Sequence, residues 1–536
     1  MPYDISTTER LAPGRTLAIN DRTGINILAP ATGQTVVSFN NAGTILVNSD
    51  SPYLVAGFNY DYNSQSEGSV FTNEATGVLR VVSTGGQNGT MGFTSVWGQT
   101  GWTGEFINHG TFEVEATAWA MGISTFNQGL AVTNTGRFVV RSETNAFAVY
   151  ANYGASVINS GLIEATGPFA SAIRSIDRPS DVFNSGTIRA VTTGTEGWGI
   201  GIGLGGSGPD VSHIDNSGLI EAQYAILDET DWSFWPAVQI VTNSGRIVGM
   251  IDLARGDDTL INSGSITGEV WLGYGTDVYD GRGGTHVGAV HGSFGNDVLT
   301  GGDGADVLFG EDGDDVISGG AGNDFLQGGR GDNVIDGGTG IDTLIYAGLT
   351  RGVDLDLAAG TATAAGRDQI SGIENVYGSI WADHLRGDAG SNLLFGSDGA
   401  DILDGRGGAD TLVGGAGADT LTGGDGDDTF VFGTGDGADV ITDLSTGDRL
   451  VIHGYTGSRQ TVQVGADVRI TLSDTDSILL RNTTVSAVVS QTTFNTTPRP
   501  AYNAAGEAPE LLGLVHVEIR DRFVIVEGET VVFDQG

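Results

Sequence analysis

An aspartate recurs every nine residues through the middle of the chain, at the sixth place of a glycine-rich unit. Six units run without a break from Gly292 to Ile345, and they read GSFGNDVLT, GGDGADVLF, GEDGDDVIS, GGAGNDFLQ, GGRGDNVID and GGTGIDTLI. Five more follow from Gly387 to Val431, with a shifted copy at 434–442 and weaker copies from residue 253 onward. So many copies in one period predict a repeating turn that presents one carboxylate per unit.

The residue types in this unit favour a hard divalent cation. Glycines adopt the left-handed dihedral angles of a tight turn, and their bare backbone lets carbonyl oxygens point toward a common centre. Calcium takes about six to eight oxygen ligands, whereas zinc and copper prefer nitrogen and sulfur. The chain has no cysteine, which agrees with calcium. A purely structural roll with solvated carboxylates is the alternative, and it is disfavoured because stacked, unneutralised aspartates repel one another.

Short strands must position these carboxylates. The three residues after each turn begin or centre on an aliphatic side chain, which is enough for one strand whose middle residue enters a narrow core. Two units would then form one coil of a parallel roll.

With this period the chain resembles the RTX (repeats-in-toxin) family over residues 253–442. The resemblance implies that units two apart stack on one side of the roll and that calcium ions bridge adjacent turns. Asp297 and Asp315 would line one side, and Asp306, Asp324 and Asp342 the other. The metal-site residues implied are Asp297, Gly301, Asp303, Asp306, Gly310, Asp312, Asp315, Gly319, Asp324, Gly328, Asp342, Asp401, Asp410, Asp419, Asp425, Asp428 and Asp439.

Three units depart from the pattern at the ligand place. Asn333 and Asn392 replace aspartate, and His286 stands there in the weaker copy GRGGTHVGA. Calcium affinity depends on the number of charged ligands. We expect these rungs to bind calcium weakly or not at all.

The composition also favours a chain that binds cations. The formal net charge is −42, with 66 acidic residues against 24 basic ones, and the chain contains no lysine. This balance argues against nucleic acid as a partner, because phosphate binding needs a basic face. Hydrophobic residues make up 39% of the chain, which favours a folded solenoid over an acidic disordered chain.

The amino-terminal half carries a second, looser repeat built on Asn-X-Gly. Its copies are FNNAGTILV at 39, FINHGTFEV at 106, VTNTGRFVV at 132, VINSGLIEA at 157, VFNSGTIRA at 182, IDNSGLIEA at 214, VTNSGRIVG at 241 and LINSGSITG at 260. Asparagine and glycine tolerate the left-handed region, and the flanking residues alternate as strands do. The pattern predicts a parallel β-helix of about eight to ten coils, with stacked asparagines as an internal ladder. At the level of repeats this half resembles adhesins, autotransporter passengers and polysaccharide-acting enzymes.

Together the repeats predict an all-β chain, in which a right-handed parallel β-helix runs into a calcium-binding parallel β-roll with a carboxy-terminal β cap. The expected segments are 1–250 for the β-helix, 251–345 and 387–442 for the two roll blocks, 346–386 for a spacer and 443–536 for the cap and an export signal.

Turn and strand patterns refine the spacer and the cap. In the spacer, GVDLDLAAGTATAAG predicts two strands around a turn. In the cap, alternating runs at 461–472 and 477–481 predict strands, and 492–510 has the composition of a flexible linker.

The route of export is inferred from absent signals and from the resemblance. The first thirty residues lack a basic start, an apolar core and a small-residue cleavage site, and no segment is apolar for about eighteen residues. The RTX resemblance implies export from a Gram-negative cell by the type I secretion apparatus, guided by an uncleaved carboxy-terminal signal. The expected location is extracellular or at the cell surface.

Two functions stay open for the β-helix. The first is a non-enzymatic adhesin, surface-layer or matrix protein, with polysaccharide, lipopolysaccharide or further copies of itself as partners. The alternative is a polysaccharide lyase or epimerase with a β-helical catalytic module and an RTX tail. A serralysin-type protease lacks support because the sequence has no HExxH motif. A toxin acylated on lysine is excluded, since there is no lysine.

Catalytic residues are only weakly indicated. Asp228, Glu229 and Asp231 lie in ILDETDWSFWPA beside two tryptophans, and paired carboxylates with aromatic neighbours suit glycosidic chemistry. A solvated surface loop is the plainer interpretation of the same residues.

Overall fold

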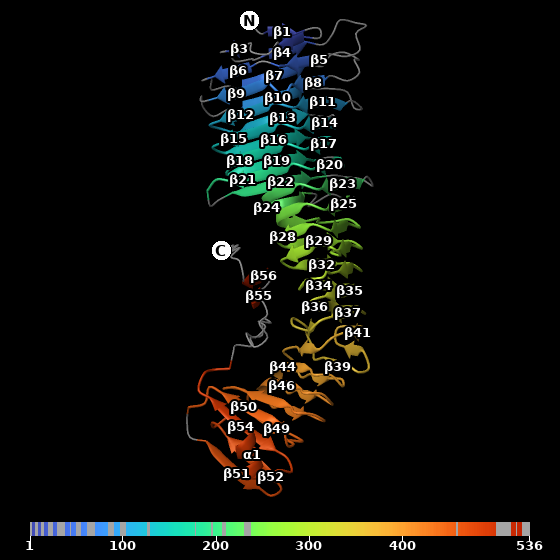
Figure 1. Ribbon diagram of the computed structural model, residues 1–536, viewed down its shortest axis with the longest axis vertical. Coiled ribbons are helices and arrows are strands. Elements are labelled where there is room, and N and C mark those ends of the chain that lie inside the picture. The colour runs from blue at the N-terminus through green and yellow to red at the C-terminus, as the bar shows by residue number, and fades with distance from the viewer. Residues whose placement is uncertain are drawn as a thin grey trace. The chain divides into compact units, whose positions relative to one another are not determined.

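A computed structural model provides the structure of the chain. It describes residues 3–5, 9–11, 16–19, 25–28, 38–42, 44–49, 55–61, 70–83, 90–96, 103–125, 129–176, 178–194, 197–205, 211–229, 237–456, 459–499, 516–520 and 523–527. The chain divides into two compact units, residues 1–286 and 287–536. Both are built from β-strands (Figure 1), and the prediction of an all-β chain is confirmed.

The first unit is a parallel β-helix whose coils carry three rows of strands (Figure 1). The first row holds β2 (Glu9–Leu11), β5 (Ser38–Asn41), β8 (Val70–Asn73), β11 (Thr103–Asn108), β14 (Gly129–Asn134), β17 (Ala155–Asn159), β20 (Asp181–Asn184), β23 (Val211–Asn216), β25 (Val238–Asn243), β27 (Thr259–Asn262) and β30 (Val278–Asp280). The second row holds β3 (Thr16–Ile19), β6 (Thr44–Ser49), β9 (Val78–Ser83), β12 (Thr111–Ala116), β15 (Arg137–Ser142), β18 (Leu162–Gly167), β21 (Thr187–Thr192), β24 (Leu219–Asp228), β26 (Arg246–Asp252), β28 (Ser265–Thr267) and β31 (Thr285–Val287). The third row holds β1 (Tyr3–Ile5), β4 (Ile25–Leu28), β7 (Val55–Asp61), β10 (Thr90–Val96), β13 (Ala120–Thr125), β16 (Asn145–Ala151), β19 (Phe169–Ser175), β22 (Trp198–Leu204) and β29 (Val270–Tyr274).

A ladder of buried asparagines runs through these coils. From Asn41 to Asn243, each asparagine side chain donates a hydrogen bond of 2.7–2.8 Å from Nδ2 to Oδ1 of the asparagine one coil later. The predicted internal ladder is therefore confirmed, because stacked amides satisfy one another where water cannot reach them. Its members are Asn41, Asn73, Asn108, Asn134, Asn159, Asn184, Asn216, Asn243 and Asn262.

The glycine of the Asn-X-Gly motif serves a different purpose from the one predicted. Gly161 does not have the positive φ of a left-handed turn residue. A β-carbon on Gly161 would instead overlap the carbonyl oxygen of Gly136 in the preceding coil. Close approach of successive coils therefore selects glycine here, and the left-handed turn that the motif suggested is wrong.

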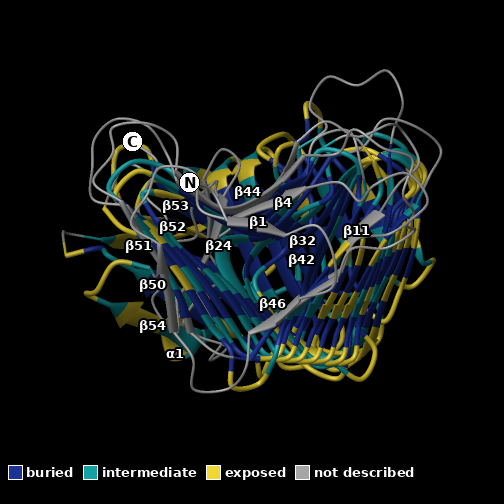
Figure 2. Cartoon of the chain, turned by 90° about the horizontal axis from the view of Figure 1, so that it is seen from above, coloured by how far each residue is buried: buried dark blue, intermediate teal, exposed yellow. Residues whose placement is uncertain are grey.

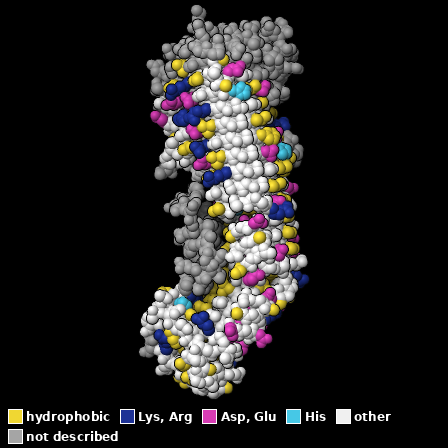
Figure 3. Space-filling model, viewed as in Figure 1, with side chains coloured by type: hydrophobic (Ala, Val, Ile, Leu, Met, Phe, Trp, Pro, Cys, Tyr) yellow, Lys and Arg dark blue, Asp and Glu magenta, His cyan; other side chains and the backbone are white. Residues whose placement is uncertain are grey.

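The outer surface of the first unit carries ion pairs between coils. Arg80 binds Glu115 across one coil at 3.1 Å, and Arg141 binds Glu164 across another at 3.1 Å. Figure 3 shows basic and acidic side chains side by side down this flank. Such exposed pairs stabilise a fold only slightly, so the ladder and the apolar core carry the coil stacking.

The second unit is a roll of two facing sheets, called here sheet A and sheet B. Sheet A holds β32 (Val290–Phe294), β34 (Val307–Asp312), β36 (Phe325–Arg330), β38 (Thr343–Ile345), β42 (Asn375–Tyr377), β44 (Leu393–Gly399), β46 (Thr411–Gly417), β48 (Thr429–Phe432), β50 (Arg449–His453) and β54 (Thr492–Asn495). Sheet B holds β33 (Val298–Thr300), β35 (Val316–Ala321), β37 (Val334–Thr339), β39 (Asp354–Asp356), β40 (Thr361–Thr363), β41 (Arg367–Ser371), β43 (His384–Arg386), β45 (Ile402–Asp404), β47 (Thr420–Thr422), β49 (Ala438–Ile441), β51 (Gln460–Val464), β52 (Asp467–Thr471) and β53 (Ser477–Leu480).

The eighth place of each nonapeptide fills the interior of the roll. Leu308 pairs with Leu326 in sheet A, and Ile317 pairs with Ile335 in sheet B, each one coil apart. All four side chains are buried. Figure 2 shows that buried residues lie inside the coils, whereas exposed residues gather at the turns. Two nonapeptides per coil therefore position the turns in register, as the period predicts.

The spacer and the cap differ in part from the sequence predictions. The predicted strand pair in the spacer is present, because β39 and β40 pair antiparallel. In the cap, the run at 461–472 forms β51 and β52, and the run at 477–481 forms β53. A short helix, α1 (Val485–Gln491), was not predicted. Its β-branched sequence favours a strand, yet the side chain of Thr484 caps its first turn. The linker prediction is wrong at its start, since β54 pairs with β50.

Candidate calcium centre

The sixth-place aspartates of the roll stack in columns along the coils. The backbone amide of Asp297 donates to Oδ1 of Asp315, one coil later, at 2.9 Å, and the amide of Asp315 donates to Oδ1 of Asn333 at 3.0 Å. The same bond, at 2.8–3.0 Å, links Asp306 to Asp324, Asp324 to Asp342, Asp383 to Asp401, Asp401 to Asp419, Asp419 to Asp439, Asn392 to Asp410, Asp410 to Asp428 and Asp428 to Asp448.

In most of these residues the other carboxylate oxygen, Oδ2, is buried and accepts no hydrogen bond. A buried carboxylate oxygen without a donor is strongly destabilising, so the folded roll needs a proton or a cation at each one. Asp306 differs, because its Oδ2 accepts a hydrogen bond of 2.7 Å from the amide of Gly302 in its own turn. The residues with this unsatisfied oxygen include Asp315, Asp324, Asp342, Asp401, Asp410, Asp419 and Asp428.

Glycine carbonyls meet these carboxylate oxygens at one point per turn. A β-carbon placed on Gly310 would lie within 3.0 Å of both Asp315 Oδ2 and the carbonyl oxygen of Gly328, one coil later. Gly319 has the same surroundings, formed by Asp324 Oδ2 and the carbonyl oxygen of Gly337. The first-place glycine thus leaves open a small space lined by oxygen from two successive turns. Gly396 and Gly405 repeat this arrangement in the second block.

The donor set fits a hard cation that is held largely by the backbone. Among the described residues, no three histidine, aspartate or glutamate side chains gather around a single point. Each turn instead offers one carboxylate oxygen and nearby carbonyl oxygens, and calcium accepts both kinds of ligand. Transition metals that prefer nitrogen or sulfur do not suit this set.

Burial raises the pKa of the aspartates in the columns. Desolvation is the main cause, and it raises the pKa of Asp315 to about 7, of Asp401 to about 8 and of Asp439 to about 8. Neighbouring carboxylates in the same column add to the effect, while a backbone hydrogen bond to Oδ1 opposes it. In the metal-free roll, these aspartates therefore bind protons more readily than solvent-exposed aspartates do.

The metal-free roll should lose stability as the pH rises. The pKa of these aspartates is 3.8 in the unfolded chain and about 7 to 8 in the folded roll. Their protonation therefore stabilises the fold fully below pH 3.8, and this contribution is lost as the pH passes about 7 to 8. With chelator, we expect a higher melting temperature at pH 5 than at pH 8. With calcium the order should reverse, because the cation competes with protons for the same oxygens. Repulsion among the many ionised carboxylates would by itself lower the melting temperature in chelator as the pH rises, so a control is needed. The control is Asp315→Asn, whose melting temperature should change less steeply with pH. An unchanged slope in this variant would contradict the assignment.

Several predicted ligands lie elsewhere. Asp303 and Asp425, at the third place of their units, are exposed. Asp312, also at the third place, is half-buried and accepts a hydrogen bond of 3.2 Å from Arg330. Their side chains lie outside the columns of sixth-place carboxylates, and the sequence pattern could not separate the two places because aspartate is common at both.

The units without aspartate are satisfied by the protein itself. Asn333 donates from Nδ2 to Asp368 Oδ1 at 3.0 Å, and Tyr346 donates to Asp368 Oδ2 at 2.9 Å. Asn392 Oδ1 accepts a hydrogen bond of 2.9 Å from the amide of Asp388. His286 lies in the first unit, where Nε2 is 2.8 Å from the carbonyl oxygen of Gly268. Weak calcium binding at these three units stays a prediction.

A similar column occurs in the first unit. The amide of Asp258 donates to Asp277 Oδ1 at 2.7 Å, and the amide of Gln239 donates to Asp258 Oδ1 at 2.6 Å. Gln239 also donates from Nε2 to Asp228 Oδ2 at 3.1 Å. Burial raises the pKa of Asp258 to about 9. The weak copy LARGDDTLI was the signal for Asp258, but nothing in the sequence connected it to Asp228.

The weak catalytic candidates belong to separate contacts. Asp228 is buried and bonded to Gln239, whereas Glu229 forms an ion pair with Arg174. The guanidinium of Arg174 also lies over the rings of Phe147 and Trp198. Asp231 lies outside the described residues. The two described carboxylates thus already have protein partners.

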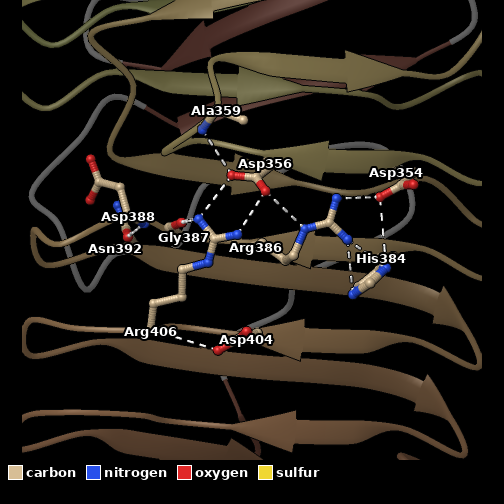
Figure 4. Close-up of polar contacts among 10 residues, drawn as sticks. All are labelled: Asp354, Asp356, Ala359, His384, Arg386, Gly387, Asp388, Asn392, Asp404 and Arg406. Carbon is tan, nitrogen blue, oxygen red and sulfur yellow. Dashed lines mark hydrogen bonds and ion pairs between the residues drawn. The ribbon is translucent and has the colours of Figure 1, made fainter.

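An arginine network ties the spacer to the second block (Figure 4). Arg406 binds both oxygens of Asp356 at 2.7 and 2.8 Å, and Arg386 donates to Asp356 at 3.2 Å. Arg386 also binds Asp354 at 2.6 Å. The hydrogen bond with Arg406 is the main reason that the pKa of Asp356 falls to about 2. This network fixes β39 against the following coils.

Replacing Asp356 by asparagine should weaken the spacer. The change removes a two-pronged, charge-assisted contact, and we expect a loss of about 2 kcal/mol in the free energy of unfolding with calcium bound. Denaturant unfolding at neutral pH measures it. Asp354→Asn is the matched control, because Asp354 is 62% exposed and its pair with Arg386 should contribute less than about 1 kcal/mol. Equal losses in the two variants would count against this role.

Comparisons with known proteins identify the repeat in the second unit. A model of the RTX calcium-binding nonapeptide repeat matches the chain four times, at residues 289–317, 309–344, 377–412 and 404–441. Among solved structures, the extracellular lipase LipA from Serratia marcescens is similar at 22% identity, covering 42% of this chain and 44% of the lipase, with a TM-score of 0.17. The match thus spans less than half of the lipase. No curated protein matches the chain. In the described part, no helix is both long and apolar enough to cross a membrane. Residues 289–344 and 377–441 therefore consist of RTX calcium-binding nonapeptide repeats.

Proposed function

We propose that the protein is a secreted, calcium-binding structural or adhesive protein whose roll closes when calcium binds outside the cell. The observation that carries this proposal is the row of buried Oδ2 oxygens that accept no hydrogen bond beside glycine carbonyls. Without a cation, these carboxylates must be protonated or the turns must open. Bound calcium supplies the missing positive charge.

The column aspartates are the proposed ligands, together with carbonyl oxygens of the first-place glycines. Sites of the extracellular kind have dissociation constants of about 10⁻⁴ to 10⁻³ M, so they stay empty in the cytosol and fill outside the cell. Export by the type I apparatus belongs to the same proposal, since an unfolded chain would pass before calcium is met. The proposed side-chain ligands are Asp297, Asp306, Asp315, Asp324, Asp342, Asp401, Asp410, Asp419, Asp428 and Asp439.

The number of bound calcium ions tests this assignment. Elemental analysis of the purified protein after equilibrium with calcium should find several ions per chain. The double variant Asp315→Asn and Asp324→Asn should bind fewer, because it removes a charged ligand from each side of the roll. Asp303→Asn, whose residue is exposed, should bind as many as the parent protein. A protein that retains no calcium, or an equal loss in all variants, would contradict the proposal.

The structural role rests on the first unit. Its coils are joined by the buried ladder, and their outer surface carries paired charges. Such a solenoid presents an extended surface. Light scattering and negative-stain imaging with calcium should show ordered assemblies or clusters that disappear with chelator. A monodisperse protein under both conditions would remove the support for self-assembly and favour a test for polysaccharide lyase or epimerase activity.

A further inference from the structure

The outer face of sheet A in the second unit is apolar and buried. Strand side chains alternate between the two faces of a sheet. Leu308 points into the roll, so its neighbours Val307 and Phe309 point outward, yet they are only 9% and 4% exposed. The same outward row continues through Ile345 and Phe395, and these residues form one hydrophobic cluster.

Sheet B shows how an uncovered outer face looks in this roll. Its outward valines, Val298, Val316 and Val334, are 38%, 45% and 41% exposed. They occupy corresponding places in neighbouring coils, as the register of β33, β35 and β37 shows. The difference between the sheets means that sheet A has a cover. Ala347 packs against the cluster and accepts a hydrogen bond of 2.8 Å from Gln327, so the segment after β38 supplies a part of it.

The described chain leaves the roll next to this face. Arg499 binds Asp436 Oδ2 at 2.8 Å, and its side chain lies against Gly433. Gly433 follows β48, whose Val431 belongs to the hydrophobic cluster. The ion pair is largely buried, since the two side chains are 15% and 7% exposed. It therefore fixes the point from which the last 37 residues, 500–536, begin.

These residues are long enough and apolar enough to cover the face. Eight strands of sheet A, from β48 to β32, span about 34 Å at the usual spacing, whereas an extended chain of this length reaches about 120 Å. The segment contains VHVEIR and FVIVE, which form the strands β55 (His516–Arg520) and β56 (Phe523–Glu527). Their register pairs Val517 with Val526 and Ile519 with Val524, so aliphatic residues stand opposite one another in the two strands.

We propose that residues 500–536 fold back along the outer face of sheet A and that this face is a docking site for the chain's own carboxy-terminal segment. Sheet A exists only in the folded roll, so the segment is free before the roll forms and is captured afterward. This order of events rests on the proposed calcium-dependent folding. Docking itself does not require it.

Photocrosslinking of the full chain tests the docking site. A benzoylphenylalanine is placed at Phe309 on the outer face of sheet A, and at Val316 on the outer face of sheet B as the matched control. An equal mixture of nitrogen-15-labelled and unlabelled protein is irradiated with calcium, and the joined peptides are identified by mass spectrometry. Circular dichroism confirms that both variants fold.

We expect residue 309 to join to peptides of residues 500–536 from the same molecule, and residue 316 not to do so. Mixed-isotope products would mean that a second copy covers the face, and the absence of any product with residues 500–536 would also overturn the proposal. Irradiation in the presence of chelator separates docking of residues 500–536 from calcium-dependent folding of the roll. If the product to residues 500–536 persists there, docking holds and calcium-dependent folding fails.

Discussion

Replacing Gly310 by alanine should remove calcium binding from the coil of Asp315 and destabilise the roll. The added β-carbon would fill the space between Asp315 Oδ2 and the carbonyl oxygen of Gly328. Overpacking a closely packed site costs about 1 to 3 kcal/mol, and the lost calcium site adds to this. Denaturant unfolding with saturating calcium, together with the number of bound ions, measures both effects.

Gly304→Ala provides the matched control for this prediction. Gly304 stands at the fourth place of the preceding unit, it lacks a positive φ, and a β-carbon there would meet no atom within 4 Å. We expect its free energy of unfolding to change by less than about 0.5 kcal/mol and its calcium content to stay the same. If both alanines had equal effects, the space beside Gly310 would not be a cation site.

Replacing Asn159 by alanine should destabilise the β-helix by about 3 to 5 kcal/mol. Asn159 accepts a hydrogen bond from Asn134 and donates one to Asn184, both of 2.8 Å, in a fully buried ladder. Removing this side chain leaves a cavity and deprives Asn134 and Asn184 of a hydrogen-bond partner. Hydrogen exchange of residues 129–192, compared with the parent protein, measures the effect.

Ile158→Ala is the control for the ladder. Ile158 precedes Asn159 in β17, but its side chain points outward and is 51% exposed. We expect a loss of less than about 1 kcal/mol. Similar losses in the two variants would mean that coil stacking depends on strand propensity and not on the buried amides.

The sequence predicted the features that follow from periodicity. A nine-residue period fixes turns, short strands and an inward eighth side chain, so the roll and the stacking of Asp315 below Asp297 could be foreseen. The Asn-X-Gly motif likewise predicted the ladder, because its asparagines recur once per coil and can only satisfy one another inside it.

Features that depend on contacts between distant segments could not be foreseen. Gly161 is required by its close contact with the preceding coil, and a rule for local turns does not include that contact. The segment after α1 looked like a linker, yet β54 pairs with β50 and Arg499 reaches Asp436. Asp228 was a catalytic candidate because of its neighbours in sequence, whereas its hydrogen bond to Gln239 places it in a buried column.

Hydrogen exchange of the full chain, with excess chelator and with about 10 mM calcium, tests the central claim most directly. Folding of the repeats on calcium predicts that peptides within 292–345 and 387–442 exchange freely without calcium and become protected with it. Peptides within 129–192 should be protected under both conditions, because the asparagine ladder needs no cation. Equal protection of the repeat peptides in chelator and in calcium would contradict the account.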